Sequence, residues 1–161
     1  MITQQQVLDT FEYREGKLYW KVKPSNQIAV GAQAGCINSH GYAVVRLGGV
    51  LYRVHRIVFL MHNGYLPTYI DHIDGNRLNN EISNLREATA SQNACNKPLQ
   101  SNSKSGIKGV TWKPKLKHWC VEIQANKIRH YCGIFKDLEL AQLVAVEARD
   151  KYQKQFAYKG N

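Results

Sequence analysis

A short polar segment, DHIDGNRLNNEISN at residues 71–84, combines groups that could hydrolyse a phosphodiester bond. Such hydrolysis needs a base that deprotonates the attacking water and a cation that neutralises charge on the phosphate. His72 suits the base, because the unperturbed pKa of histidine lies near neutrality. Asp71 and the side-chain oxygen of Asn93 are hard ligands that suit Mg²⁺, which keeps waters and borrows substrate oxygens. Asn84 could tie the loop together and orient His72.

The positions of the polar residues in this segment can be compared with those that other kinds of site require. An EF-hand would need polar ligands at loop positions one, three and five before its glycine, and counting back from Gly75 puts Ile70 first, which fails. A zinc site would need more cysteine or histidine close by, and none is present. A purely structural loop remains open, since asparagine favours turns and caps.

The flanking sequence predicts a β-hairpin followed by a helix. Residues 69–72 form a short predicted strand, residues 73–82 a turn-rich loop and residues 83–87 a returning strand. The segment TASQ at residues 89–92 matches a capping box, so a helix should begin at its second residue and carry Asn93 in its first turn. This arrangement would bring the end of the first strand close to the first helical turn.

The residues before the hairpin predict a scaffold of strands and one helix. Alternation in GKLYWKV indicates a half-buried strand, and two β-rich runs flank a two-glycine turn at residues 48–49. The run HRIVFLMHNG has helical spacing, and Gly64 stands where a C-terminal helix glycine belongs.

The residues after the hairpin predict a second, smaller domain. A Pro, Ser, Asn and Lys-rich stretch at residues 97–105 is typical of an exposed linker. Three strand-like runs follow, namely IKGVTW, HWCVEIQA and IRHYCGIF. Asp137 is a plausible N-cap for a last helix, whose apolar stripe would pack on the sheet. The stripe consists of Leu138, Ala141, Val144, Ala145, Ala148, Tyr152 and Phe156.

Composition and charge favour a polyanionic partner. The chain has 161 residues and a formal charge of +10. Residues 1–100 carry 10 basic against 7 acidic side chains, and residues 101–161 carry 12 against 5, so most of the excess lies in the last third. Basic residues interleaved with aromatics put nucleic acid first among such partners. The four cysteines form no CxxC pair, so we expect reduced thiols.

The chain shows neither a signal-peptide pattern at its start nor an apolar run of about 18 residues. The first observation predicts a cytosolic protein, in the host-cell cytosol if the gene belongs to a phage. The second excludes a membrane span.

IDHIDGNRLNNEISNLREATASQNACNK resembles the core of HNH homing-type endonucleases of phages and mobile introns, over roughly residues 52–97. The resemblance implies a ββα-metal core. It implies that His72 is the general base, that Asp71 is a metal ligand and that Asn84 is a structural brace. Asn93 stands at the last motif position, where Asn replaces His, and would be the second ligand. That variant implies one Mg²⁺ or Mn²⁺ per active site.

The basic stretch at residues 103–161 resembles the AP-two DNA-binding domain of plant ethylene-response factors, which also occurs beside HNH cores. That family inserts a three-stranded sheet into the major groove. Several family arginines are replaced by Lys or Gln here, and lysine lacks the fork that arginine offers to guanine, so phosphate contacts should dominate. The residues expected to contact DNA are Lys108, Thr111, Lys113, Lys115, Lys117, Gln124, Arg129 and Tyr131. Arg56, at the predicted helix start, could also reach a phosphate.

The combined expectation is an α+β protein with an HNH nuclease domain at residues 1–98, a linker at 99–105 and an AP-two-like domain at 106–161. The nuclease domain would join a ββα-metal core to a β-hairpin scaffold, and the second domain would pack three antiparallel strands on one helix. The expected function is metal-dependent cleavage of double-stranded DNA by a free-standing homing-type enzyme. A homodimer is one form in which such an enzyme could act on both strands. The alternative is a DNA-binding regulator that retains the HNH fold without cutting.

Overall fold

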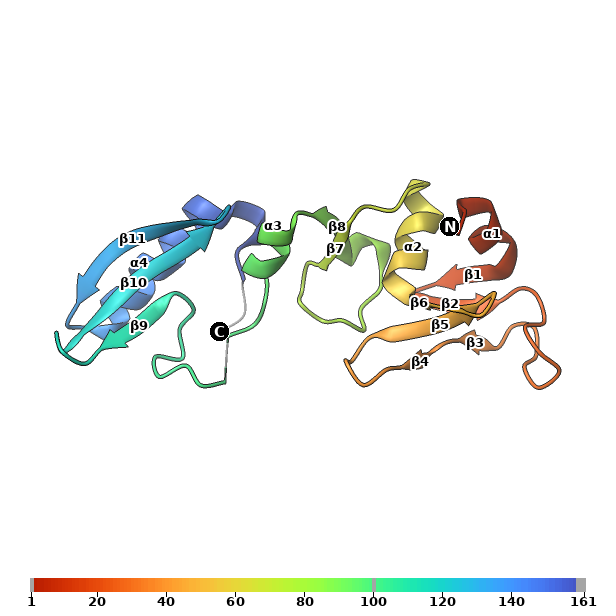
Figure 1. Cartoon of the computed structure of the whole chain (residues 1–161), viewed down its shortest axis with the longest axis horizontal. Helices are drawn as coiled ribbons and strands as arrows, with labels where there is room; N and C mark the ends of the chain where they lie inside the picture. Colours follow the sequence, from red (N-terminus) through yellow and green to blue (C-terminus); the bar gives the residue numbers. More distant parts are fainter. Residues whose placement is uncertain (1, 100, 159–161) are drawn as a thin grey trace. The chain divides into compact units, whose positions relative to one another are not determined.

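The computed structural model describes residues 2–99 and 101–158, and the chain divides into two compact units, residues 1–87 and 88–161 (Figure 1). Residue 100 of the expected linker and residues 159–161 of the expected second domain lie outside the described residues. The division groups residues 88–98 with the second unit, whereas the sequence interpretation placed them with the first.

The first unit opens with a helix that the sequence interpretation did not include. Helix α1, Gln4–Thr10, begins at a capping box made by Thr3 and the third helical residue. Strands β1, Phe11–Arg14, β2, Lys17–Trp20, and β3, Gln33–Ala34, follow and form one antiparallel sheet in the order β1-β2-β3.

A second antiparallel sheet of the first unit has the order β4-β5-β6. Its strands are β4, Cys36–Ile37, β5, Ala43–Leu47, and β6, Val50–Arg53. The predicted turn at residues 48–49 is confirmed. Both glycines there have positive φ, which the tight hairpin connection requires and which other residues adopt at a cost.

Helix α2, Val54–Asn63, contributes seven buried residues to the first unit, more than any other element of that unit. It ends as predicted at Gly64, whose φ of 78° is left-handed. Ile57 and Val58 are 1% and 0% exposed and pack with residues of α1, β1 and β2 in one core. Full burial of one such side chain contributes about 1.5–3 kcal/mol, so α2 anchors the strands around it.

Strands β7, Tyr69–His72, and β8, Leu85–Ala88, form a two-stranded sheet that carries the polar segment. A short 3₁₀ helix, Ile82–Asn84, precedes β8, so the returning strand begins two residues later than predicted. The backbone N–H of Ile73 donates to the carbonyl of Asn84 at 2.9 Å, which closes the loop at its base.

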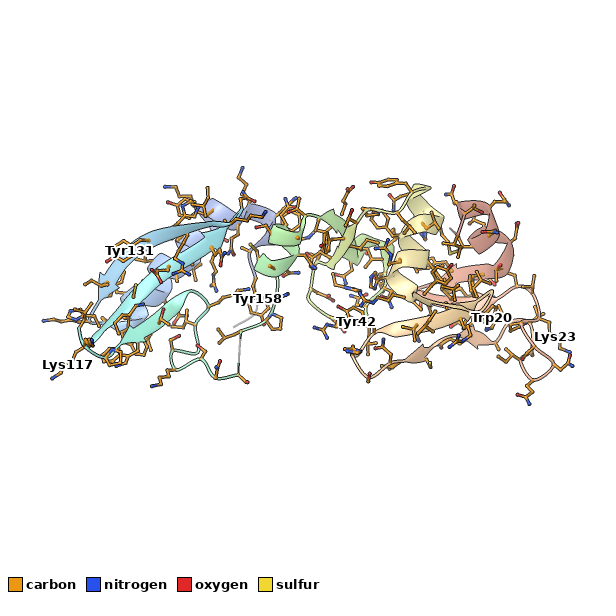
Figure 2. All side chains as sticks on the ribbon, viewed as in Figure 1. Trp20, Lys23, Tyr42, Lys117, Tyr131 and Tyr158 are labelled. Carbon is orange, nitrogen blue, oxygen red and sulfur yellow. The ribbon has the colours of Figure 1, made fainter. Side chains whose placement is uncertain are left out.

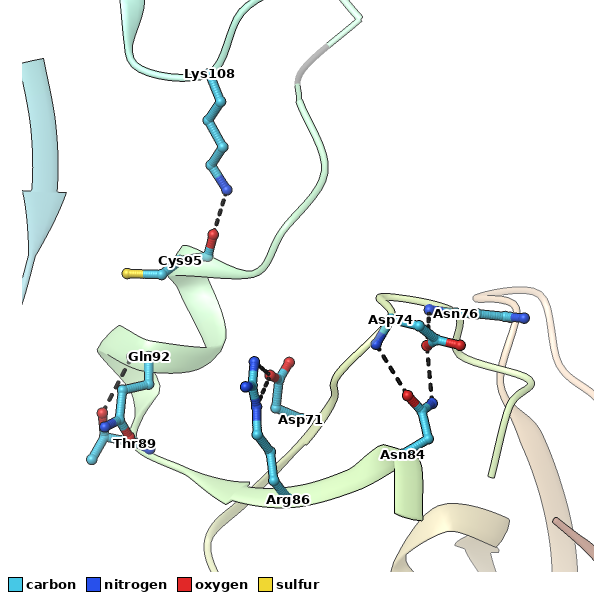
Figure 3. Close-up of polar contacts among 9 residues, drawn as sticks. All are labelled: Asp71, Asp74, Asn76, Asn84, Arg86, Thr89, Gln92, Cys95 and Lys108. Carbon is cyan, nitrogen blue, oxygen red and sulfur yellow. Dashed lines mark hydrogen bonds and ion pairs between the residues drawn. The ribbon is translucent and has the colours of Figure 1, made fainter. Parts of the chain in front are cut away.

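Helix α3, Ala90–Cys95, begins at the predicted residue. The Thr89 hydroxyl accepts from the backbone N–H of Gln92 at 3.2 Å, and the Gln92 side chain accepts from the backbone N–H of Thr89 at 2.7 Å (Figure 3). The predicted capping box is thereby confirmed.

The second unit contains the predicted three-stranded antiparallel sheet, in the order β11-β10-β9. Its strands are β9, Val110–Lys113, β10, His118–Ala125, and β11, Ile128–Phe135. Asn126 and Lys127 turn between β10 and β11 with φ of 49° and 66°, as a two-residue hairpin requires.

Helix α4, Leu138–Gln153, covers one face of this sheet (Figure 1). The Asp137 carboxylate caps it as predicted, accepting from the Leu140 N–H at 2.8 Å. Ala141 and Ala145 are fully buried against the sheet, so the predicted apolar stripe is confirmed there. Phe156 lies beyond the helix in a 3₁₀ turn, Lys154–Phe156, and packs in a separate cluster.

No helix in the described part of the chain is long and apolar enough to cross a membrane.

Gly109 allows the chain to pass closely over β10, and we expect Gly109→Ala to destabilise the second unit. A Cβ at this position would meet Cδ1 of Ile123 and the backbone oxygen of Glu122 at 3.2 Å. Gly106→Ala is the matched control, because Gly106 also has positive φ but has nothing within 4 Å of its Cβ position. Denaturant unfolding should show that Gly109→Ala costs about 1–3 kcal/mol more than the control. Equal costs would contradict close packing here.

Candidate active site and nucleic-acid interface

Asp71 and Arg86 form the ion pair at the centre of the β7–β8 sheet. The Asp71 side chain is 5% exposed, and its Oδ2 accepts from Nε of Arg86 at 2.9 Å and from Nη2 at 2.7 Å (Figure 3). Charge-assisted bonds of this length are among the stronger side-chain contacts in proteins. The pair therefore holds the Asp71 carboxylate in one orientation.

His72, the next residue of β7, is buried beside a second histidine. It is 7% exposed, and its ring meets the His55 ring edge-on at a centroid distance of 4.9 Å. Burial is the largest cause that lowers the pKa of His72, and it outweighs the nearby Asp71 and Asp74 carboxylates, which raise it. The ring is therefore held neutral at neutral pH, as a base must be.

Burial also lowers the pKa of His55, to about 3, with smaller contributions from His72, Arg53 and Arg56. Two adjacent charged imidazoles would repel each other in this low-dielectric site. His55 is thus a neutral aromatic wall for His72.

The side chain of Asn80 contacts the His72 ring directly. The distance from His72 Nε2 to Asn80 Oδ1 is 3.1 Å, and Asn80 Nδ2 donates to the Leu78 carbonyl at 3.3 Å. The second bond sets the amide so that its oxygen faces the ring. An amide oxygen only accepts, so the contact favours the tautomer with its proton on Nε2.

Asn84 braces the loop that follows His72. Its Oδ1 accepts from the Asp74 N–H at 3.1 Å, and its Nδ2 donates to the Asp74 carboxylate and the Asn79 carbonyl, both at 2.9 Å (Figure 3). Burial alone would raise the pKa of Asp74, but hydrogen bonds from Asn79, Asn84 and the Asn76 N–H lower it overall. Asn84 therefore bonds groups within the loop, while the contact with the His72 ring comes from Asn80, and the role of Asn84 in the site stays a prediction.

Asn93 lies half-buried in the first turn of α3, in the second unit, whereas Asp71 and His72 belong to the first. Its backbone N–H donates to the Thr89 carbonyl at 3.0 Å as part of the helix. Asn96, the other asparagine of this segment, is the buried C-cap residue.

The donor chemistry of the expected ligands fits a hard divalent cation. Asp71 offers a carboxylate at a buried position, and Asn93 offers an amide oxygen. Among residues 2–99 and 101–158, no group of three or more His, Cys, Asp or Glu side chains could hold a metal ion. Mg²⁺ does not depend on such a group, since it keeps waters and is commonly bound by one or two carboxylates with substrate phosphates.

One face of the sheet in the second unit is open. Residues paired across strands share a face, and the pairs Gln124 with Arg129 and Glu122 with Tyr131 lie opposite the side that α4 covers. We define the open face by these four residues together with Thr111 and Lys113 on β9.

Most of the residues predicted to contact DNA lie on this open face. Thr111, Gln124 and Arg129 are exposed, and so is Tyr131, which is 63% exposed. The Tyr131 side chain is labelled on the second unit in Figure 2. Lys115 and Lys117 lie exposed in the turn between β9 and β10. The predicted residues of the sheet are therefore accessible together, and their DNA contacts stay a prediction.

A groove of about 910 Å³ lies on the open face, where all of its defining residues except Tyr131 line it together with residues of the segment that precedes β9. Its charged lining consists of Lys97, Lys104, Lys108, Lys113 and Arg129 against Glu122. An excess of positive charge along a concave surface attracts a polyanion.

Lys108 and Arg56 make internal contacts that the sequence interpretation did not foresee. Nζ of Lys108 donates to the carbonyl of Cys95 (Figure 3) and to that of Lys97, each at 2.5 Å. Burial lowers the pKa of Lys108 to about 8. Arg56 donates to the carbonyls of Pro67 and Thr68 at 3.2 and 3.4 Å. A DNA contact by either side chain would compete with these bonds.

The structure also adds residues that sequence reasoning missed. Asn80 and Arg86 touch His72 and Asp71, and both stand in the segment that the sequence had singled out. Asn80 is an asparagine among six in residues 69–96, so only coordinates distinguish it from its neighbours. Arg86 and Glu87 are neighbours on β8, so strand alternation puts them on opposite faces, and charge complementarity with Asp71 favours Arg86 as the residue on its side.

Comparisons with known proteins agree with the resemblance of the core segment. A family model described as HNH endonuclease matches residues 52–95. Protein 3.8 of Escherichia phage T7 is 35% identical over 109 residues, which cover 65% of this chain and 88% of that protein. The uncharacterized HNH endonuclease L560 of Acanthamoeba polyphaga mimivirus is 45% identical over 62 residues, which cover 37% of this chain and 33% of that protein. No solved structure matches the chain.

Lys108 and Lys113 offer a matched pair that separates internal contacts from DNA contacts. Lys108→Met leaves two carbonyls without their donor, so we expect about 1–3 kcal/mol less stability and an unchanged salt dependence of DNA binding. Lys113→Gln should leave stability nearly unchanged and reduce the slope of log K against log salt by about 0.9, for one lost phosphate contact. Unfolding and binding titrations measure both. An equal loss of slope in the two variants would contradict the assignment.

Proposed function

Because this chain belongs to the same family as protein 3.8 of phage T7 and holds an HNH endonuclease domain at residues 52–95, we propose that it is a divalent-metal-dependent DNA endonuclease. The observation that carries the proposal is the buried pair of Asp71 and His72 at the end of β7, held by Arg86 and Asn80. A carboxylate next to a neutral histidine supplies one metal ligand and one base at the same point.

In the proposed reaction, His72 takes the proton of the attacking water. Burial keeps the ring neutral, and the Asn80 oxygen at Nε2 leaves the basic lone pair on Nδ1. His55 walls one side of the ring and limits its rotation. The Asn84 brace holds the loop in which Asn80 stands, so the base is oriented before DNA binds.

Asp71 and Asn93 would hold one Mg²⁺ or Mn²⁺ per active site. The bound cation would neutralise negative charge on the scissile phosphate and on the leaving oxygen. Arg86 keeps the Asp71 carboxylate oriented for this role.

The second unit would dock the nuclease on double-stranded DNA through its open face, as its resemblance to AP-two domains implies. Lysine and glutamine at Lys113 and Gln124 favour phosphate contacts over base readout. The biological role that we propose is that of a free-standing homing-type enzyme acting in the host cytosol. One centre cleaves one strand per visit, so a double-strand break would need a dimer or a second visit.

We expect His72→Ala to reduce plasmid nicking at least about 10²-fold in Mg²⁺, with DNA affinity nearly unchanged, because the base is lost and the binding surface is kept. Gel analysis of supercoiled plasmid measures the rate, and EDTA should abolish it in the unaltered chain.

His62→Ala is the control for this experiment, since His62 lies at the end of α2 and bonds the Val58 carbonyl. It should cleave like the unaltered chain. If the unaltered chain produces no nicked plasmid with any divalent metal while it binds DNA tightly, the regulator that keeps the fold without cutting is the better interpretation.

We expect Asn80→Leu to lower kcat about 10- to 100-fold with little change in KM, because the ring of His72 loses the acceptor that orients it. Asn80→Asp retains the acceptor and should cleave faster than Asn80→Leu. Single-turnover and steady-state cleavage of a duplex separate the two constants, and thermal unfolding checks the fold. A rise in KM with kcat unchanged would refute a positioning role.

A further inference from the structure

Two arginines of the first unit share one tyrosine ring next to His72. The guanidinium carbon of Arg53 lies 4.4 Å from the centre of the Tyr42 ring, and that of Arg77 lies 5.0 Å from it. Arg53 is the N-cap residue of α2, and Arg77 belongs to the loop after β7. Elements 24 residues apart in sequence (77 minus 53) therefore bring two cations to one ring.

Tyr42 connects this pair with the histidines. Its ring centre is 5.6 Å from that of His55 and 6.4 Å from that of His72. The turn before it is rigid, because the Asn38 side chain accepts from the backbone N–H groups of His40 and Tyr42, each at 3.0 Å. The Arg77 Nη1 donates to the His40 carbonyl at 2.9 Å, which fixes that arginine on the same turn.

Neither arginine is neutralised. Both side chains are exposed, and within residues 2–99 and 101–158 neither forms an ion pair with a carboxylate. Arg14 shows the contrast: its guanidinium also lies over a tyrosine, Tyr19 at 4.8 Å, but it is paired with Glu12 at 2.5 Å. Two positive charges held at one ring without a carboxylate partner attract an anion to that ring.

Stacking leaves the arginines able to bind such an anion. A guanidinium that contacts an aromatic face keeps its N–H donors at its edge, where they match the oxygens of a phosphate. The positive charge also reaches the histidines, since Arg77 contributes to the lowered pKa of His72 and Arg53 to that of His55.

We propose that Arg53, Tyr42 and Arg77 form a phosphate clamp that holds the DNA backbone beside the scissile phosphate. This inference rests on the proposed endonuclease function and adds to it a binding site in the first unit. Its ligand is a phosphodiester of the cleaved strand, one or two linkages from the bond that the water activated by His72 attacks. The tyrosine ring orders both guanidiniums before DNA arrives.

The first test measures binding of a fluorescent 30-base-pair duplex to the full chain in EDTA, at several KCl concentrations. Arg53→Gln and Arg77→Gln should each reduce the slope of log K against log salt by about 0.9, as one lost phosphate contact does. Arg77→Lys keeps the charge and should keep the slope, while its affinity falls about two- to fivefold through loss of the stacked fork. The charge of Arg14 is already neutralised by Glu12, so Arg14→Gln should change neither the salt slope nor the affinity.

The outcome would overturn the clamp if Arg53→Gln and Arg77→Gln both kept the slope of the unaltered chain, or if Arg14→Gln reduced it equally. Thermal unfolding of each variant confirms that the fold is kept. Because the assay contains no metal, its result stands whether or not the chain cleaves DNA. If the unaltered chain does not cleave DNA but the two arginine variants have a reduced salt slope, the nuclease function is rejected and the phosphate site is retained.

The second test places the clamp relative to the cut. Single neutral methylphosphonate linkages are introduced on each side of a mapped cleavage position. One or two of them should slow cleavage by the unaltered chain about tenfold or more and have little further effect on Arg77→Gln. Equal slowing of both proteins at every position would show that the arginine does not contact those phosphates.

Discussion

The hydrogen bonds of one buried amide, Asn84, hold the candidate site together. The loop between β7 and β8 is polar throughout, and such a loop has few apolar contacts to order it. Asn84 bonds both the backbone and the carboxylate of Asp74, and it bonds the Asn79 carbonyl. Asn80 follows directly and meets His72. Removing one buried partner from such a network leaves the other polar groups without hydrogen bonds. The ordered conformation of the loop therefore depends on Asn84.

The second constraint on the site is electrostatic. Burial opposes charge on His72 and His55, whereas the carboxylates of Asp71 and Asp74 favour it on His72. Arg86 takes up part of the Asp71 charge through two bonds to Oδ2. The balance leaves a neutral base next to an anionic ligand, which is the combination that water activation at neutral pH requires.

The sequence predicted the local elements well wherever one residue type determines the backbone. Gly64, the glycines at 48–49, the capping box at Thr89 and the Asp137 cap all lie where their chemistry predicted. These signals act over three or four residues, so they do not depend on the rest of the fold. The HNH core was likewise identified from its motif, at roughly residues 52–97, and an HNH endonuclease family model matches residues 52–95.

The sequence did not predict contacts made across elements. Asn80 was one asparagine among many, and nothing local distinguishes its bond to His72 from the turn bonds of its neighbours. Lysine is a common residue type at DNA contacts, yet the ammonium group of Lys108 lies against the end of α3. Arg53, Tyr42 and Arg77 stand on separate elements, and only the tertiary structure of the first unit brings them to one ring. Their roles as site residues remain predictions that such geometry motivates.

These contacts suggest a division of labour in DNA binding between the two units. The second unit offers Lys113 on its open face and Lys115 and Lys117 in the adjoining turn, and lysines are flexible point charges that tolerate many positions of the backbone. The arginines of the first unit are ordered by the Tyr42 ring and by the His40 carbonyl, so they accept a phosphate in fewer orientations. A flexible contact contributes affinity at any register, whereas an ordered contact next to His72 selects one. On the proposed function, the second unit would therefore govern how tightly the duplex is held, and the arginine pair would govern which phosphodiester bond reaches the base.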